Sequence, residues 1–366
     1  MTRERNEAPP AWIVGLAGLI LALIFVQTIT DVYGDATGFL KVPAYDPALV
    51  SYVERHLGAV VFAPEAGHDG HFFFNLAMDP WLIDPEEHAT FLDRPIYRAQ
   101  RILYPMLAGA FGIASPRFAV LGLIFVNIAA LAVGTWATSQ LSTSLGGPPW
   151  SGLFFVLNPG LIFELSIDGS SILGMALAIL GVRLSSQSRW TTAAALFALA
   201  ALSRESMALF AVGVFAYSWV VRKRPIWRLI VIPALASVAW AAWARVRLSG
   251  LTDRATIPIF DDPFIGLSES IPHWFIQGGS SLWLGLITLT CAAVTILASL
   301  KRPSWLAWAT VLFAPLLLIL SSDVLRAGFD ITRAVAPLIT AGLVLMTAHL
   351  WRQPTLLRRA TDFESQ

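Results

Sequence analysis

Long apolar runs separated by short polar segments dominate this chain. A transmembrane helix needs about 20 apolar residues to cross roughly 30 Å of hydrocarbon. The pattern predicts spans near residues 11–29, 117–139, 150–166, 170–184, 190–203, 206–221, 226–245, 281–300, 304–321 and 334–351. A further apolar run, 102–114, is too short to span. We therefore expect an all-α polytopic membrane protein, a bundle of about ten transmembrane helices.

The charges of the short loops predict the orientation of these helices. If residues 98–114 form an interfacial helix rather than a span, alternate loops form one strongly basic set and one mixed set. The basic set includes Arg222-Lys223-Arg224 and Lys301-Arg302. Basic loops stay in the cytoplasm, so we expect both termini to be cytoplasmic. Six tryptophans then form an aromatic belt near the inner headgroups: Trp150, Trp190, Trp219, Trp227, Trp305 and Trp351.

Two polar segments, 31–116 and 248–280, are then left on the extracytoplasmic side. The first is far too long to be a simple connector. No linker rich in glycine and serine and no internal repeat divides the chain. We expect residues 1–366 to form a single membrane domain, with the first segment as an embedded extracytoplasmic cap.

Composition supports the membrane assignment and narrows the function. Of the 366 residues, 56% are hydrophobic and 13% are charged, with a mean hydropathy of +0.66. Soluble domains have about twice this share of charged residues. A net charge of +1 gives no positive electrostatic field that would attract nucleic acid, so we do not expect a nucleic-acid partner. The single cysteine, Cys291, excludes an internal disulfide.

Two further features bear on location. Basic residues precede the apolar run at 11–25, as in a secretion signal, but no small-residue cleavage site follows, so we expect a retained first helix. Only three of the 25 basic residues are lysine, which is typical of a GC-rich bacterial genome. We expect a multi-pass protein of a bacterial plasma membrane.

The densest group of chemically active side chains lies in the segment Gly67 to Pro80. Asp69 stands between His68 and Gly70-His71, just before an aromatic run, and Asp79 follows. Glycine lets backbone approach a ligand closely, so Asp69 is a candidate site residue. The alternatives are an Asp-Gly turn before an amphipathic helix, and a metal site. Three ligands from one local segment make a weak metal signal.

A second group lies between Asp93 and Pro105. Four side chains recur every three or four residues and should share a helical face: Arg94, Tyr97, Arg98 and Arg101. Guanidinium groups fixed at a bilayer surface can bind a phosphate bidentately. The alternatives are lipid headgroups, or salt bridges to Asp79 and Asp93.

More ionisable residues occur at the expected outer ends of the helices. They are Asp168, the pair Arg204-Glu205, and Arg326, Asp330 and Arg333. Ionisable residues at the edges of membrane helices tend to be functional. All of these residues are expected on the same side of the membrane as Asp69, which favours a functional site. The alternative is a purely structural role, in which Arg204 would form an ion pair with Asp168.

These motifs together resemble those of the GT-C superfamily of integral-membrane glycosyltransferases. The similarity rests on Asp69-Gly70-x-Phe72-Phe73, on Arg101-Ile102-x-Tyr104-Pro105, on Asn158-Pro159 running into Asp168-Gly169-Ser170-Ser171, and on Leu202-Ser203-Arg204-Glu205-Ser206. The pattern is most similar to the mannosyltransferases that use dolichyl-phosphate-mannose in GPI-anchor assembly, and to their bacterial relatives. It covers roughly residues 11–221.

The resemblance implies an inverting transfer of one sugar from a polyprenyl-phosphate donor to a lipid-linked, glycan or protein acceptor, outside the cytoplasmic leaflet. It implies no cofactor, and it makes Asp69 the general base. The expected substrate-binding residues are His68, His71, Asp79, Tyr97, Arg98, Arg101, Asp168, Arg204, Glu205, Arg326 and Arg333.

Three other functions remain open. A transporter or flippase of a lipid-linked substrate usually has repeated halves and polar residues near the midplane. A polysaccharide polymerase would share the lipid-linked donor, and a non-catalytic relative would serve as a partner subunit. The chain has no nucleotide-binding motif.

Overall fold

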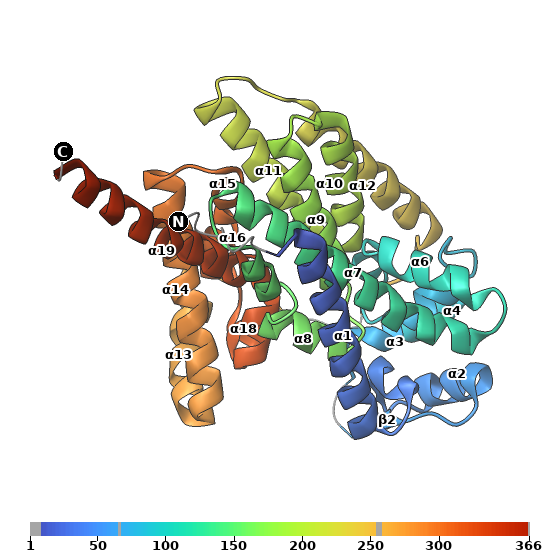
Figure 1. Ribbon diagram of the computed structural model, residues 1–366. Helices are drawn as coiled ribbons and strands as arrows, with labels where there is room; N and C mark the ends of the chain where they lie inside the picture. The colour runs from blue at the N-terminus through green and yellow to red at the C-terminus, as the bar shows by residue number, and fades with distance from the viewer. Residues whose placement is uncertain (1–8, 65–66, 254–257, 365–366) are drawn as a thin grey trace.

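The computed structural model describes residues 9–64, 67–253 and 258–364, with side chains up to Arg352. The described chain is almost entirely helical (Figure 1). Two short strands, β1 (Val42–Pro43) and β2 (Phe62–Ala63), pair in parallel with Val42 opposite Phe62. The expectation of an all-α architecture is therefore confirmed.

The α-helices follow one another along the whole described chain. In order, they are α1 (Ala11–Tyr33), α2 (Pro47–Leu57), α3 (Asp69–Met78), α4 (Pro85–Phe91), α5 (Pro95–Ala99), α6 (Leu103–Gly112), α7 (Pro116–Ser144), α8 (Pro159–Ser166), α9 (Ser171–Ser186), α10 (Trp190–Ser203), α11 (Ala208–Ala216), α12 (Arg228–Arg247), α13 (Ile265–Gln277), α14 (Gly279–Lys301), α15 (Trp305–Val311), α16 (Phe313–Ile319), α17 (Ser322–Leu325), α18 (Gly328–Ala334) and α19 (Ala336–Glu364). Short 3-10 or π turns add η1 (Ala36–Leu40), η2 (Pro149–Phe154), η3 (Glu205–Met207) and η4 (Tyr217–Val221).

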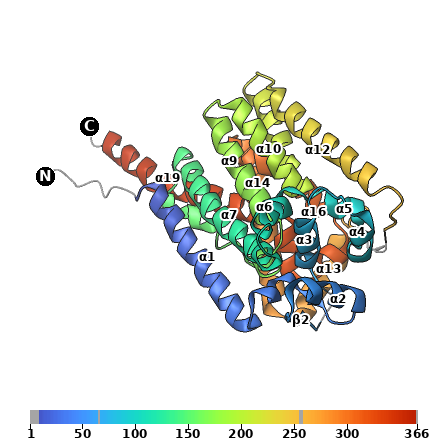
Figure 2. The same ribbon diagram turned by 90° about the vertical axis from the view of Figure 1, so that its right-hand side faces the viewer.

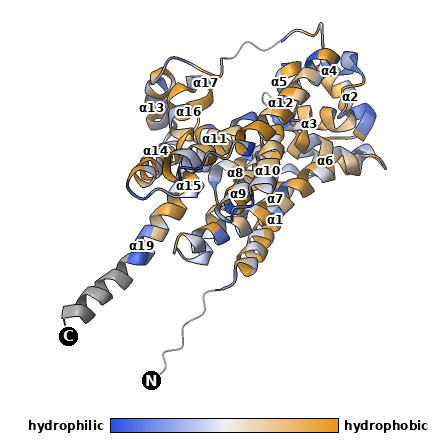
Figure 3. Ribbon diagram, turned by 90° about the horizontal axis from the view of Figure 1, so that it is seen from above, coloured by the Kyte–Doolittle hydropathy of each residue, from blue (hydrophilic) through white to orange (hydrophobic). Residues whose placement is uncertain are grey.

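Four of these helices, α1, α7, α12 and α14, are long and apolar enough to cross a membrane. Helices α18 and α19 pass the same test as a pair and are bent by 79° at their junction, which would make a fifth span. Other apolar helices are shorter; α9, for example, has 16 residues, or about 24 Å at 1.5 Å per residue. Hydrophobic residues predominate along the long helices (Figure 3). By length and composition, four or five helical segments among the described residues could therefore span a membrane.

The expected span at 150–166 is interrupted. The turn η2 ends at Phe154, and α8 starts only at Pro159. Proline has no backbone N–H and is favoured in the first turn of a helix. Asn158 caps α8 by accepting a 2.9 Å hydrogen bond from the backbone N–H of Gly160. Its side-chain amide also donates to the carbonyl of Ala336 at the bend before α19.

Residues between α1 and α7 form a layer of short helices at one side of the bundle, coloured blue to cyan in Figure 1. Asp46 caps α2 through the backbone N–H groups of Ala48 and Leu49. Helix α12 runs down toward α4 and α5 (Figure 2). Its Arg247 donates to the carbonyl of Leu82 at 2.8 Å, so this layer is tied to the bundle.

The segment expected as one interfacial helix at 98–114 is instead divided between α5 and α6. A continuous helix would need a hydrogen bond from the N–H of residue 105 to the carbonyl of Arg101. Pro105 has no N–H, so the helix breaks before it and restarts at Leu103. The break leaves Arg101 in the turn between the two helices.

Helix α7 lies at the centre and packs against α1, α6, α9 and η2. Glycines allow its closest contact with α1. A Cβ added at Gly18 would lie 2.7 Å from the side chain of Thr135, and one at Gly15 would lie 2.9 Å from Trp136. Small residues at a helix interface are the usual means of close packing in membranes.

Candidate functional site

Asp69, the first residue of α3, is the centre of the site. Arg98 donates to its Oδ1 at 2.6 Å, and Arg333 donates to its Oδ2 at 3.2 Å. Arg101 adds an ion pair at 3.7 Å. The residue is only 6% exposed. Burial alone would raise the pKa of Asp69, but Arg98, Arg333 and Arg101 outweigh it and hold the pKa well below its usual range.

Arg98 is fixed on two sides. Its Nε and Nη2 donate to the two carboxylate oxygens of Asp93 at 2.8 and 2.9 Å. Its guanidinium also stacks 4.1 Å from the ring centre of Phe72. A guanidinium held in this way presents one remaining edge, through Nη1, to Asp69 with little rotational freedom.

Arg101 is almost fully buried and connects the cap to the helical bundle. It forms a bidentate pair with Glu205 in η3, with distances of 2.9 and 2.7 Å. It also donates to the hydroxyl of Tyr97. The helical spacing of Tyr97 and Arg101 in the sequence therefore does bring them together, although helix α5 ends between them.

Glu164 is a site residue that the sequence interpretation missed. It is fully buried in α8, accepts hydrogen bonds from Arg204 at 2.9 Å and from the backbone N–H of Ser171 at 3.0 Å, and forms an ion pair with Arg333 at 2.9 Å. A single carboxylate within an apolar run was the available signal. That run belongs to the span expected at 150–166.

The backbone beside Glu164 is adapted to this carboxylate. A Cβ added at Gly169 would overlap the Glu164 side chain. Arg204 also donates to the hydroxyl of Ser171 at the start of α9. Arg204 therefore pairs with Glu164 and not with Asp168, which corrects the pairing expected from the sequence.

These contacts form one continuous network of arginines and carboxylates, here called the arginine cluster. Its members are Asp69, Asp93, Arg98, Arg101, Glu164, Arg204, Glu205 and Arg333. They come from α3, the α5–α6 region, α8, the start of η3 and α18. The formal charges balance, four positive against four negative. An anion that enters the cluster must therefore replace a carboxylate as the partner of a guanidinium.

The two histidines beside Asp69 have different environments. His71 is buried, and its Nδ1 has no hydrogen-bond partner among the described residues. Burial and Arg98 lower the pKa of His71 to about 4, so the ring is neutral at pH 7. His68 is half-buried against Phe163, and burial together with Arg333 lowers its pKa. Neither ring bonds to the carboxylate of Asp69 in the described contacts.

Besides His68, His71 and Tyr97, three more expected site residues lie outside the arginine cluster. Asp79 ends α3, accepts from the N–H of Asp84 at 2.9 Å and contacts buried His88 at 3.2 Å, which is a structural role. Arg326 is exposed, and the described contacts show no side-chain bond from it to the cluster. Asp168 has a left-handed backbone, φ 50°, and makes no ion pair with Arg204 in the described contacts, where Arg204 pairs with Glu164.

Asp168 is nevertheless an unusual residue. It is fully buried, its carboxylate makes no well-formed hydrogen bond within the described residues, and the hydroxyl of Tyr104 lies beside it. Next to it, Asn127 in α7 donates to the carbonyl of Gly169 and to the hydroxyl of Tyr104. None of these three side chains makes an ion pair with the arginine cluster in the described contacts.

Metal binding was one alternative for the segment around His68, Asp69 and His71. Within the described ranges, no three His, Cys, Asp or Glu side chains are grouped closely enough to hold a metal ion. The partners of Asp69 are arginines, which repel a cation and attract an anion. The residues present therefore fit a phosphate or carboxylate group better than a metal.

Comparison of the whole chain with protein-family models, curated proteins and solved structures finds no match. The functional assignment accordingly depends on the geometry of the arginine cluster. Any proposed function must account for four guanidinium groups in one site, three of which contact the carboxylate of Asp69.

Proposed function

We propose that the protein is a membrane glycosyltransferase of the GT-C type, which transfers a single sugar from a polyprenyl-phosphate donor with inversion. The observation that carries this proposal is the convergence of Arg98, Arg101 and Arg333 on Asp69. A transfer from a lipid phosphate needs cationic groups for the leaving phosphate and a carboxylate for the attacking hydroxyl. The arginine cluster contains both within one connected site.

The proposed topology has ten spans, with the shorter apolar helices included, and both termini in the cytoplasm of a bacterial cell. The arginine cluster then faces the extracytoplasmic side. A polyprenyl donor would lie with its chain in the bilayer and its phosphate at the cluster. The acceptor would be a lipid-linked, glycan or protein hydroxyl that approaches through the cap formed by residues 31–116.

In the proposed reaction, the acceptor oxygen attacks the anomeric carbon of the sugar. The bond from that carbon to the phosphate oxygen breaks, and its electron pair leaves with polyprenyl phosphate. The hydroxyl proton passes to the carboxylate of Asp69. This step is general base catalysis, which is typically worth about 10²–10⁴-fold in rate.

The ion pairs of Asp69 give this mechanism a specific requirement. A carboxylate whose pKa is held far down by arginines is a weak base. Arg98 and Arg333 each have a second carboxylate partner, Asp93 and Glu164, that would keep them in place. When the donor phosphate binds beside these fixed guanidinium groups, its negative charge offsets theirs, and the basicity of Asp69 rises. Donor binding would thus activate the base.

The test is the pair Asp69→Asn and Asp79→Asn, assayed in membranes with equal protein levels against a panel of polyprenyl-phosphate sugars. Asp69→Asn keeps the shape of the side chain and removes the proton acceptor, so transfer should fall by about 10²–10⁴-fold. Asp79→Asn is the matched control at the other end of α3 and should reduce transfer far less. Transfer by Asp69→Asn at the wild-type rate would show that Asp69 is not the base.

Folding must be followed in parallel, because Asp69 is a buried ion-pair partner. The thermal midpoint and the gel-filtration profile in detergent serve this purpose. A variant that remains folded and still binds the donor, but does not transfer sugar, supports the catalytic role. A folded wild-type protein that transports a lipid-linked sugar without transferring it would favour the flippase alternative.

A further inference from the structure

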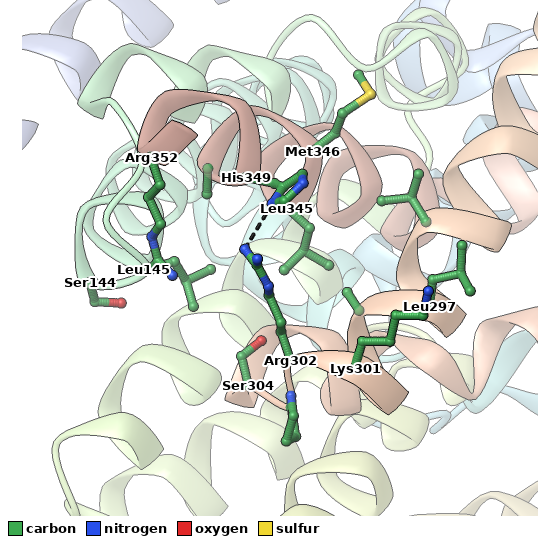
Figure 4. A pocket seen from close by; sticks show the side chains of 14 residues that line it. Ser144, Leu145, Leu297, Lys301, Arg302, Ser304, Leu345, Met346, His349 and Arg352 are labelled. Atoms are coloured by element: carbon green, nitrogen blue, oxygen red, sulfur yellow. Dashed lines mark hydrogen bonds between the residues drawn. The ribbon is translucent and has the colours of Figure 1, made fainter. Parts of the chain in front are cut away.

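A cavity of about 540 Å³ lies at the end of the molecule opposite the arginine cluster. It is bounded by the last turn of α7, the turn between α14 and α15, and one face of α19 (Figure 4). Helix α14 starts beside α18, where Ser281 packs on Gly328, and ends at Lys301 in the cavity wall. Its 23 residues place the two sites about 35 Å apart along the helix.

The polar lining of this cavity is basic. It contains the side chains of Lys301, Arg302, His349 and Arg352, and none of the described residues that line it is acidic. Arg302 donates to Nδ1 of His349 at 2.8 Å (Figure 4, dashed line). This contact holds the guanidinium of Arg302 across the cavity, between α14 and α19. The concentration of positive charge favours an anionic occupant.

The rest of the wall is apolar. Leu145, Leu297, Leu345 and Met346 line it, and Leu297 and Met346 are also exposed on the outer surface of their helices. These helices, α14 and α19, are among those apolar enough to cross a membrane. Exposed Trp351 lies one turn or less from the basic residues of α19, as expected at the level of lipid headgroups.

We propose that this cavity binds the phosphate headgroup of an anionic phospholipid. The headgroup would contact Lys301, Arg302 and Arg352, and the acyl chains would lie along Leu297 and Met346. Basic pockets between transmembrane helices at the headgroup level are suited to such lipids. A free phosphate or a soluble anion would use the charges but would gain nothing from the apolar wall, which is why we favour a lipid.

This site is distinct from the donor site proposed above, because it lies at the other end of α14. The inference therefore stands independently of whether the protein transfers sugar. An occupant in contact with α7, α14 and α19 would link these three helices at this end. Lipid binding should accordingly stabilise the folded protein, as any ligand that prefers the folded state does.

The experiment uses the full-length protein in a neutral detergent, titrated with phosphatidylglycerol, with phosphatidylcholine or with inorganic phosphate. Binding is read as the shift in thermal midpoint and by native mass spectrometry. Phosphatidylglycerol should bind at least tenfold more tightly than phosphatidylcholine and raise the midpoint. The double variant Lys301→Gln with Arg302→Gln should lose this preference.

Arg224→Gln is the control, because it removes an equally exposed positive charge outside the cavity, and it should keep the preference. If the double variant does not fold, Leu297→Trp provides a second test, since the larger side chain fills the cavity without changing its charge and should weaken lipid binding. Equal binding of both lipids, or a preference unchanged in the folded variants, would overturn the proposal. Saturation by inorganic phosphate at the same concentration would overturn the assignment to a lipid.

Discussion

Arg333 reaches Asp69 across 264 positions of sequence, with 3.2 Å between Nη2 and Oδ2. The same guanidinium forms an ion pair with Glu164, with 2.9 Å between Nε and Oε1. One side chain from α18 therefore joins the first residue of α3 to the centre of α8. This contact couples the cap to the C-terminal part of the bundle, and it sets the charge environment in which Asp69 must act.

Replacement of Arg204 by lysine should impair the protein even though the charge is kept. Arg204 donates to Glu164 and to the hydroxyl of Ser171, and lysine lacks the planar fork that makes such double contacts. We expect at least a tenfold weaker affinity for a polyprenyl-phosphate sugar, measured by binding in detergent. Arg228→Lys, a partner of Thr191 outside the cluster, should bind as the wild type does. Donor binding and turnover equal to wild type in Arg204→Lys would reduce Arg204 to a structural ion-pair partner.

His71 should make the folded state sensitive to mild acid. Burial and Arg98 lower its pKa from 6.5 to about 4, with Asp69, Asp93 and His68 as the other charged neighbours. Between these two values the unfolded chain takes up a proton that the folded chain does not, so the free energy of unfolding falls as the pH falls through this window. At about 1.4 kcal/mol per tenfold ratio, the loss from this ring between pH 7 and pH 4 is about 3 kcal/mol.

The measurement is the thermal midpoint of wild type and His71→Phe between pH 7 and pH 4 in detergent. The variant keeps an aromatic ring and cannot be protonated, so its midpoint should fall less steeply with acid. His273→Phe, in α13 and outside the cluster, should retain the wild-type slope. Identical slopes for wild type and His71→Phe would mean that His71 takes up its proton equally in both states.

Gly169→Ala should destabilise the protein because the new methyl group would overlap the carboxylate of Glu164. Overpacking of this kind typically costs about 1–3 kcal/mol, and here it would also displace the partner of Arg204 and Arg333. We expect a lower thermal midpoint and weaker donor binding. Gly279→Ala is the matched control, since no atom lies within 4 Å of its added Cβ. Equal stability of the two variants would contradict the tight packing at Gly169.

The proposed topology can be tested by labelling single cysteines in intact cells. Native Cys291 is buried and should give little background. Cysteines at the exposed positions Glu86 and Asp262 should react with an impermeant thiol reagent added from outside. Cysteines at Gln187 and Arg224, also exposed, should react only after the membrane is opened. External labelling at Arg224 would contradict the ten-span orientation and place the arginine cluster on the cytoplasmic side.

The sequence by itself determined that this chain is helical and apolar enough for a membrane, because these properties follow from local composition and run length. It also identified most of the arginine cluster, since buried or interfacial charges in an apolar chain are rare enough to be noticed one by one. The position of Asp69 beside glycine and histidine was sufficient to single it out.

The partners of those charges were decided only by the tertiary structure. Arg204 pairs with Glu164 at 2.9 Å, whereas buried Asp168, which has a left-handed backbone, makes no ion pair in the described contacts. Asp79 and Arg326 are ionisable, as the site residues are. Asp79, however, accepts a hydrogen bond from the N–H of Asp84 at the end of α3, and Arg326 is exposed. Ion pairs depend on distances of a few ångströms between segments far apart in the chain, and neither hydropathy nor local spacing specifies those distances.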